Sequence, residues 1–352
     1  MFGATVVASV ALVFSTSTAF AASAIGNDVA QPQCGTALPA AGAFAVVGVN
    51  GGVANTTNVC LQQQLAWAAG ATGGSTQPRL ALYVNTANPA LNGSWWPDSN
   101  LTQQPTADAA RTPTAVSNPY GTCGHQPGTA CAYIYGYSLA RDDATVRGVP
   151  TPGAQTWWLD VETANTWQGD KAANRAVLEG MARYFTNIHA KVGVYSTPAH
   201  WTEIAGTVPA TSPLATLPSW RALGPVSRAS AAKSCGLASF TPLGRLTVTQ
   251  YVQGGLDYDV ACLKLTSAPT PHIHGTLKVG KKLSIVKHSW KPGKVALSYR
   301  WLRNGRPIAH ATHSTYTVKK ADVGKKLTIS VTGKRTGYST IVKTSAAKKI
   351  RH

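Results

Sequence analysis

The segment Trp157-Trp158-Leu159-Asp160-Val161-Glu162-Thr163-Ala164-Asn165 is an apolar run that ends in two carboxylates two residues apart. The chain of 352 residues contains only three glutamates, and Glu162 is one of them. Burying an unpaired carboxylate is costly, so two acids that close a buried strand serve no obvious packing purpose. The segment therefore predicts a strand that carries functional side chains at its carboxyl end.

The spacing of the two acids places them on one face of the predicted strand. Side chains two residues apart point the same way, so Asp160 and Glu162 lie above Trp158, while Trp157 and Leu159 face the opposite side. Neighbouring carboxylates raise each other's pKa, and an apolar wall adds to the effect. One acid can then stay protonated and donate a proton, which cleavage of a glycosidic bond requires. The alternative at this stage is a cap and salt bridge at a strand–helix junction.

The sequence around this segment alternates between apolar strands and helices. Continuous apolar strands that alternate with helices favour a parallel sheet buried on both faces. At roughly 240 residues, a closed (β/α) barrel of the TIM type fits better than an open sheet. We expect further strands at 44–49, 80–84, 192–195 and 246–251, and the strand at 246–251 is expected to be the last of the domain. Helices are expected at 60–69 and 133–146 and after the capping residue Asp170. In the helix after Asp170, one face is formed by Val177, Met181, Tyr184, Phe185 and Ile188.

Sequence motifs of several other enzyme classes are absent. No Gly-x-Gly-x-x-Gly or Gly-Lys-Thr segment follows a strand, which argues against dinucleotide and nucleoside triphosphate chemistry. No Gly-x-Ser-x-Gly segment occurs, which weakens a serine hydrolase. The cysteines form no Cys-x-x-Cys pair and have no clustered histidines, so disulfides are favoured over zinc. We expect neither a metal nor a cofactor.

The start of the chain and its cysteines indicate export. Residues 1–21 are typical of a signal peptide, with an apolar stretch at 6–14 and the small-x-small pattern Ala19-Phe20-Ala21. No later segment has the apolar length of a membrane span. We therefore expect a secreted, extracellular protein. All six cysteines follow the signal, as disulfides in an oxidising compartment would require, and we favour nearest-neighbour pairing: Cys34–Cys60, Cys123–Cys131 and Cys235–Cys262.

Charge divides the chain into two parts. From Thr270 onward there are 19 Lys and Arg and one acid, Asp322, a balance of +18. The preceding 269 residues hold 13 basic and 12 acidic residues, a balance of +1, and the two sum to the net +19. The boundary falls in Ser267-Ala268-Pro269-Thr270-Pro271, a Pro-containing linker. We predict a barrel at 25–265, a linker at 266–271 and a basic domain at 272–352.

The basic domain has the pattern of a small all-β unit. Leu297–Leu302 alternates between apolar and polar residues, and the turn Arg303-Asn304-Gly305-Arg306 follows. Further strands are expected at 314–318 and 327–331. The segments Tyr299-x-Trp301 and Ala321-Asp322-Val323-Gly324 resemble bacterial immunoglobulin-like domains of secreted proteins. This resemblance implies a sandwich with Trp301 in the core between two sheets.

Such an excess of positive charge on an exported domain calls for a polyanionic partner. Anionic wall polymers and phospholipid head groups are the candidates, and adhesion to the cell wall is the favoured interpretation. We do not expect nucleic acid as the partner of an exported protein. The alternative is a soluble spacer whose lysines protect the sheet edges.

Three segments of the first domain resemble glycoside hydrolase family 25, the lysozyme-type muramidases. Gly26-Asn27-Asp28-Val29-Ala30, with Gln31 and Gln33, is similar to the family's first strand. Leu159-Asp160-Val161-Glu162 matches its Asp-x-Glu strand end. Gln250-Tyr251, followed by Gly255-Leu256-Asp257, is similar to its closing segment. The resemblance covers the whole first domain and implies a secreted enzyme that cleaves a β-1,4 glycosidic bond in peptidoglycan or a related wall glycan.

The resemblance also implies roles for individual residues. Glu162 would donate the proton to the leaving oxygen, and Asp160 would stabilise the developing positive charge or position an N-acetyl group. Asp28 and Asp257 would orient the substrate and set the local field. The residues expected to bind the sugar are Tyr83, Trp158, Tyr195, Tyr251 and Asn50.

Two departures from the family keep a second function open. The family's Tyr-His-Phe segment is Tyr83-Val84-Asn85 here, and an insertion at 88–130 carries Trp95 and Trp96. The insertion is either a lid with an additional sugar platform or a surface loop stapled by a disulfide, with its tryptophans buried in the second case. The alternative function is a non-catalytic glycan-binding surface protein that retains the barrel.

Overall fold

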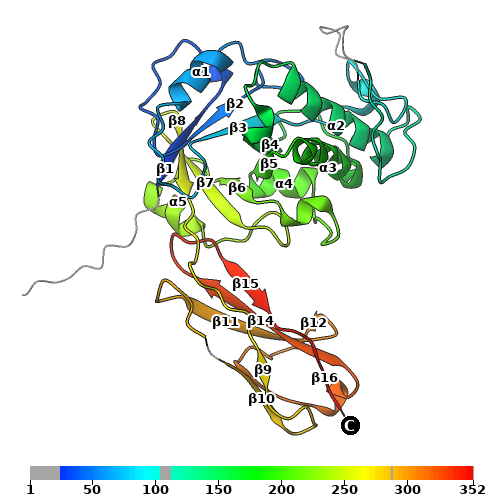
Figure 1. Cartoon of the computed structure of the whole chain (residues 1–352), viewed down its shortest axis with the longest axis vertical. Coiled ribbons are helices and arrows are strands. Elements are labelled where there is room, and N and C mark those ends of the chain that lie inside the picture. Colours follow the sequence, from blue (N-terminus) through cyan, green and yellow to red (C-terminus); the bar gives the residue numbers. More distant parts are fainter. Residues whose placement is uncertain (1–23, 104–111, 287, 352) are drawn as a thin grey trace, which may run out of the picture.

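The computed structural model of the chain describes residues 24–103, 112–286 and 288–351, and the predicted signal peptide at 1–21 lies outside them. Figure 1 shows an upper part built of strands and helices and a lower part built of strands. Among the described residues, no helix has the length and apolar character needed to cross a membrane.

The upper part is a closed barrel of eight strands. Strands β1 to β7 pair in parallel in sequence order, whereas β8 is antiparallel to both β7 and β1. The strands are β1 (Ile25–Val29), β2 (Ala45–Gly48), β3 (Leu80–Asn85), β4 (Thr156–Asp160), β5 (Lys191–Ser196), β6 (Ser219–Ala222), β7 (Leu246–Gln253) and β8 (Leu256–Ala261).

The expectation that 246–251 forms the last strand is wrong, and so is a uniformly parallel barrel. Strand β8 follows β7 through a two-residue turn, Gly254-Gly255, in which both residues have positive φ. Such a turn returns the chain antiparallel, because a parallel neighbour needs a crossover of a dozen or more residues. The short strand β6 was also not predicted.

Helices surround the barrel, and the predicted ones are present. The α-helices are α1 (Leu61–Ala68), α2 (Thr129–Thr145), α3 (Lys171–Asn187), α4 (Pro198–Ile204) and α5 (Arg228–Ser234), with short 3₁₀ turns at Gln31–Gln33, Ala90–Asn92, Pro152–Ala154 and Pro213–Thr216. The Asp170 side chain accepts a hydrogen bond from the Ala172 backbone N–H, so it caps α3 as expected. Helices α2 and α3 pack closely, because a Cβ at Gly136 would lie 2.0 Å from the Val177 carbonyl oxygen.

Strand β4 divides its side chains between two faces, as predicted. Trp158 lies inside the barrel in a buried cluster with Phe44 and Trp220. Trp157 and Leu159 face outward into the core between strands and helices, where Trp157 stacks on Phe185 at 4.4 Å. Gly193 is the partner of Trp158 on β5, and its lack of a side chain leaves room for the indole.

The insertion at 88–130 packs on α2. Trp95 and Trp96 both contact the Tyr135 ring, at 5.8 and 5.4 Å between centroids, and Trp96 is buried. The tryptophans therefore fix the loop to the barrel domain, and neither lines the pocket described below. The predicted disulfides Cys34–Cys60, Cys123–Cys131 and Cys235–Cys262 are confirmed.

The lower part, the C-terminal module, consists of two sheets. One has the order β13-β10-β9, and the other has β12-β11-β14-β15 with β16 paired to β14. Trp301 is fully buried and stacks on Tyr316 at 5.4 Å, as a core position between two sheets requires. The immunoglobulin-like assignment of this module stays a prediction. Its strands are β9 (Ile273–His274), β10 (Lys282–Ile285), β11 (Ala296–Arg303), β12 (Arg306–Pro307), β13 (Thr315–Thr317), β14 (Lys326–Lys334), β15 (Ile341–Thr344) and β16 (Lys348–Lys349), with a 3₁₀ turn at Lys320–Asp322.

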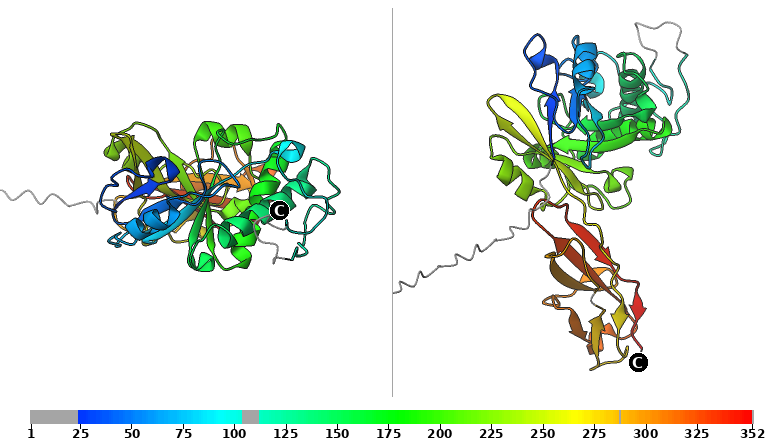
Figure 2. Two further views of the ribbon diagram at one scale, coloured as in Figure 1. Left: turned by 90° about the horizontal axis from the view of Figure 1, so that it is seen from above. Right: turned by 60° about the vertical axis from the view of Figure 1, so that its left-hand side comes forward.

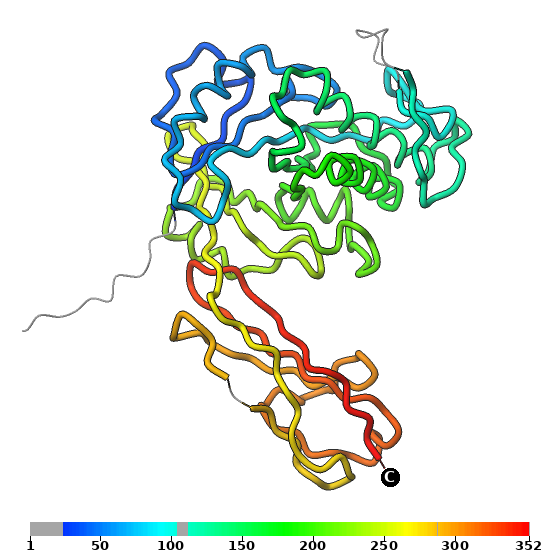
Figure 3. The backbone as a smooth tube through the Cα atoms, viewed as in Figure 1, coloured from blue at the N-terminus to red at the C-terminus, as the bar shows by residue number. Residues whose placement is uncertain are grey.

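The module docks on one end of the barrel through the β14–β15 turn. Ser339 Oγ donates to the Leu246 carbonyl at 2.6 Å, and Thr340 Oγ1 donates to the Gly236 carbonyl at 2.7 Å. Tyr338 forms a bridge with Leu263 in an apolar cluster that spans both parts. Leu246 begins β7, so the module sits at the amino-terminal ends of the parallel strands. Figures 2 and 3 show this turn beside the segment that leaves β8.

Replacing Gly193 tests the packing beneath the strand ends. A Cβ at this position would lie 2.3 Å from Trp158 Cζ3 in the barrel interior, so Gly193→Ala forces the indole to move. We expect the variant to lower the free energy of unfolding by about 1–3 kcal/mol, measured by chemical denaturation. Gly169→Ala is the control, because nothing lies within 4 Å of its added Cβ. Equal stability of Gly193→Ala and the control would contradict this packing.

Candidate active site

A pocket of about 360 Å³ opens at the carboxyl ends of the parallel strands. This is the end of the barrel where enzymes of this architecture bind their substrates. Its lining combines acids, aromatic rings and small residues: Asp28, Tyr83, Asp160, Glu162, Tyr195, Thr197, Trp220, Ala222, Gly224, Gln250, Val252 and Asp257.

All four acids named from the sequence line this pocket. Asp28 on β1 and Asp257 on β8 are direct partners across the antiparallel pair. Asp160 ends β4, and Glu162 follows it after one residue. Strands from opposite walls of the barrel therefore bring together acids that are far apart in the sequence.

The position of Glu162 is fixed by its backbone neighbours. The Val161 N–H donates to the Tyr195 carbonyl at 2.9 Å, and Ser196 Oγ donates to the Val161 carbonyl at 2.7 Å. Trp167 Nε1 donates to the carbonyl of Glu162 itself at 2.9 Å. These bonds hold the chain immediately beyond β4, so the Glu162 side chain enters the pocket from an ordered segment.

Burial makes each of these acids harder to ionise. It raises the pKa of Asp28 to about 7, with the charge of Asp257 adding to the effect. Burial, followed by the charges of Glu162 and Asp28, holds the pKa of Asp160 well above its usual range. Burial also raises the pKa values of Glu162 and Asp257. The pocket therefore retains protons at a pH where exposed carboxylic acids have lost theirs.

Amide side chains hold two of the acids in place. Gln250 Nε2 donates to Asp28 Oδ1 at 2.9 Å, and the Tyr195 hydroxyl donates to Gln250 Oε1 at 2.9 Å. Asn85 Nδ2 donates to Asp160 Oδ2 at 2.8 Å. The other oxygen of Asp160 has no hydrogen-bond partner among the described residues. This oxygen is buried, which adds to the cost of ionising the carboxyl.

His200 is a site residue that the sequence did not reveal. It lies on α4, which follows β5, and its Nδ1 is 3.6 Å from Glu162 Oε1. Burial raises the pKa of Glu162, whereas the neighbouring imidazole opposes this rise. No local pattern connects a histidine on a helix with a glutamate after another strand, so only the fold brings the two together.

Asp259 is a fifth acid, fully buried inside the barrel beneath the pocket. Its carboxyl adjoins Asp28 and Trp220 without reaching hydrogen-bond geometry with either. Burial, followed by the charge of Asp28, holds the pKa of Asp259 well above its usual range. The two-residue periodicity of a strand that starts from Asp257 would have placed Asp259 on the same face.

The predicted sugar-binding aromatic residues are only partly in the pocket. Tyr83 and Tyr195 line it, together with Trp220, which was not predicted. Trp158 lies below them and supports the pocket floor from the barrel interior. Tyr251 faces outward, is buried, and stacks on Tyr258 at 5.4 Å, because its neighbours Gln250 and Val252 take the inward positions. Neither Trp158 nor Tyr251 lines the pocket, so neither is placed to contact a sugar there.

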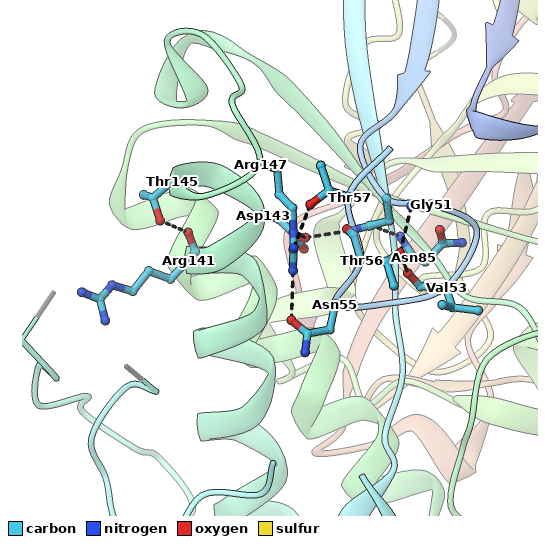
Figure 4. Close-up of polar contacts among 11 residues, drawn as sticks. Gly51, Val53, Asn55, Thr56, Thr57, Asn85, Arg141, Asp143, Thr145 and Arg147 are labelled. Atoms are coloured by element: carbon cyan, nitrogen blue, oxygen red, sulfur yellow. Dashed lines mark hydrogen bonds and ion pairs between the residues drawn. The ribbon is translucent and has the colours of Figure 1, made fainter. Parts of the chain in front are cut away.

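Asn50, also predicted to bind substrate, is a buried structural residue. Its Nδ2 donates to Asp143 Oδ1 on α2 at 2.9 Å, and its Oδ1 accepts the backbone N–H of Asn85 at 2.8 Å. Figure 4 shows Asp143 of α2 and Arg147, just beyond the end of this helix, bound to the loop after β2, where Arg147 donates to Asn55 and Thr57. Asn50 thus fixes the end of β3, from which Asn85 reaches Asp160.

Metal binding has no support in the described part of the chain. No group of three or more His, Cys, Asp or Glu side chains there is arranged to hold a metal ion. The pocket instead offers acids of raised pKa beside aromatic rings.

Comparison with known proteins points to lysozymes. The family model "Lysozyme-like protein 1" matches residues 147–251, a range that includes Asp160, Glu162 and Gln250. "Probable GH family 25 lysozyme 4" of Dictyostelium discoideum is 39% identical over 49 residues, 14% of this chain and 22% of that protein. "Lysozyme-like protein 5" of Caenorhabditis elegans is 41% identical over 51 residues, 14% of this chain and 23% of that protein.

These matches support a glycoside hydrolase family 25-like domain. The names of these relatives describe lysozymes, to which this part of the barrel is similar. The matched segments span less than a quarter of the length of these curated relatives. Two solved structures are also similar. A lysozyme from Streptomyces coelicolor is 16% identical, with 69% of this chain and 93% of that chain covered and a TM-score of 0.39. A family GH25 lysozyme from Aspergillus fumigatus is 10% identical, with 70% of this chain and 95% of that chain covered and a TM-score of 0.39.

Replacing Asp259 tests whether this acid is protonated in the folded lysozyme-like barrel. Its ordinary pKa is 3.8, and burial raises it in the folded state. Above pH 4 the unfolded chain loses a proton that the folded chain keeps, so Asp259 destabilises the fold increasingly as pH rises. Asp259→Asn has no such proton to lose. We expect it to be more stable than wild type at pH 7, and this gain to shrink towards pH 4.

Chemical denaturation at several pH values measures this difference. Asp98→Asn, at an exposed position, is the control and is expected to show little change in stability with pH relative to wild type. A loss of stability in Asp259→Asn that is equal at pH 4 and pH 7 would contradict a protonated Asp259.

Proposed function

We propose that the protein is a secreted glycosidase that cleaves a β-1,4 glycosidic bond in peptidoglycan or a related cell-wall glycan. The observation that carries this proposal is the convergence of Asp28, Asp160, Glu162 and Asp257 in one open pocket. Paired acids of raised pKa beside aromatic rings provide a proton donor and a negative field for an oxocarbenium-like transition state.

Glu162 is the proposed proton donor. It lines the pocket wall, and its raised pKa keeps a proton available. The proton passes to the glycosidic oxygen as the bond to the anomeric carbon breaks, and the leaving sugar departs with a hydroxyl group. A water molecule then supplies the hydroxyl group at the anomeric carbon and returns a proton to Glu162.

The remaining acids stabilise the positive charge that develops on the sugar and orient the substrate. When Glu162 gives up its proton, the acid cluster gains negative charge at the moment when the anomeric carbon becomes positive. Asp160, fixed by Asn85, stabilises that charge or positions an N-acetyl group. Asp28 and Asp257 orient the substrate from the opposite wall, and Tyr83 and Tyr195 contact its rings.

The C-terminal module is proposed to hold the enzyme on anionic wall polymers. Its 19 Lys and Arg against one acid, counted from Thr270, give an excess of 18 positive charges that supports an electrostatic attachment. The disulfides support an oxidising, extracellular setting.

Glu162→Gln tests the catalytic assignment. The amide keeps the size of the side chain but cannot donate an acidic proton, so we expect release of reducing ends from purified peptidoglycan to fall by about 10²–10⁴-fold. Glu203→Gln, at an exposed position on α4, is the matched control and should leave the rate unchanged. Binding of glycan by wild type without release from any wall glycan would instead favour the non-catalytic binding protein.

His200→Ala tests the pair formed with Glu162. Activity needs protonated Glu162 and is lost as pH rises through its pKa. Since the imidazole opposes the rise in this pKa, its removal should move the alkaline limb of kcat/KM to higher pH. The profile is measured on soluble peptidoglycan fragments, with His274→Ala in the C-terminal module as control. An alkaline limb that stays where it is in wild type would show that His200 does not act on Glu162, and a limb that moves to lower pH would contradict the direction of the effect.

A further inference from the structure

A second hollow lies where the barrel meets the C-terminal module. Its volume is about 500 Å³, and both parts of the chain contribute walls. The barrel supplies the end of α5 and the residues after it, and the module supplies the start of β11, the end of β14 and adjacent residues. The lining residues of this junction cleft are Lys233, Ser234, Gly236 and Leu237 from the barrel and Lys294, Ala296, Lys334, Arg335 and Thr336 from the module.

The junction cleft is lined by cations from both sides. Lys233 stands on the barrel wall, and Lys294, Lys334 and Arg335 stand on the module wall, while the lining contains no acid. Positive charges that face each other across a hollow repel and create a local field that attracts anions. The docking of the two parts therefore becomes more favourable when an anion occupies the cleft.

The walls of the cleft are held in fixed positions. The bond from Thr340 Oγ1 to the Gly236 carbonyl and the Cys235–Cys262 disulfide secure the barrel wall beside Lys233. On the module wall, the Arg335 guanidinium lies 4.8 Å from the centre of the Tyr338 ring. Tyr338 in turn belongs to the apolar cluster that joins the two parts. The backbone of both walls is thus preformed, so a ligand orders only the side chains that line the cleft.

We propose that the junction cleft binds a phosphodiester-linked wall polymer. Ammonium and guanidinium groups bind phosphate oxygens through charge-assisted hydrogen bonds, and the hydroxyls of Ser234 and Thr336 provide neutral donors beside them. Leu237 and Ala296 give an apolar surface for the carbon backbone between successive phosphates. This inference rests on the proposed attachment to anionic wall polymers and names the site at which it occurs.

The cleft and the pocket lie at opposite ends of the barrel. The pocket opens at the carboxyl ends of the parallel strands, whereas the module docks at their amino-terminal ends. A polymer in the cleft therefore does not compete with a glycan in the pocket. Inorganic polyphosphate should bind the full-length protein without inhibiting hydrolysis of soluble peptidoglycan fragments.

Charge-matched variants of the full-length protein test the site. Lys294→Gln/Lys334→Gln removes two cations from the cleft, whereas Lys348→Gln/Lys349→Gln removes two exposed cations on β16 outside it. By calorimetric titration with inorganic polyphosphate, we expect at least about a tenfold loss of affinity in the cleft variant and less than about twofold in the control. The salt slope should fall by about one for each phosphate contact removed. Lys233→Gln should also weaken binding, because the barrel supplies one wall.

Several outcomes would overturn the proposal. Equal losses of affinity in the two double variants would show that polyphosphate is attracted to the whole module and not to the cleft. Absence of polyphosphate binding by wild type would show that the cleft is not a phosphate site. Tighter binding of polyglutamate than of polyphosphate would point to carboxylates, and tighter binding of duplex DNA would point to nucleic acid. These titrations read binding alone, so an inactive Glu162 would not affect them, and a failed cleft would leave the glycosidase proposal standing.

Discussion

The cost of burying carboxylates governs the architecture around the pocket. Asp28, Asp160 and Asp259 are all enclosed by the barrel, and burial raises the pKa of each. Ionising such closely placed buried acids together is costly, so protonation of part of the cluster stabilises the fold. The same requirement provides protons for chemistry at the pocket mouth. Stability and the proposed acid catalysis therefore depend on one set of protonation states.

A line of hydrogen bonds crosses the strand ends and orders this cluster. It runs from Asp143 on α2 through Asn50 at the end of β2 to Asn85 at the end of β3, and then to Asp160 at the end of β4. The Asn50 side chain donates to Asp143 through its nitrogen and accepts the Asn85 backbone N–H through its oxygen, and the Asn85 side-chain nitrogen donates to Asp160. Neither amide side chain can therefore rotate without breaking a buried hydrogen bond. The outer helix α2 thereby sets the orientation of a carboxyl inside the pocket.

The sequence revealed those parts of the site that follow from local spacing. The apolar run before Asp160 predicted β4, and the two-residue period placed Glu162 beside Asp160. Strand β8 was missed because Leu256-Asp257-Tyr258-Asp259 alternates polar and apolar residues and does not read as a buried strand. Asn50 was misassigned because its partner Asp143 lies 93 residues away. Contacts between residues far apart in the sequence leave no periodic signal in a single sequence. His200 was missed for the same reason, because only the fold brings it to Glu162.

The reversed direction of β8 has a consequence for how a long polymer reaches the enzyme. Had β8 run parallel to its neighbours, the chain would have left the barrel at the rim of the pocket, and the C-terminal module would have emerged beside the substrate. The two-glycine turn before β8 sends the chain out through the base instead. The rim is left without a flanking domain on the exit side. For the proposed glycosidase, the module can therefore hold a wall polymer at the base of the barrel while a glycan strand enters the pocket at the opposite end.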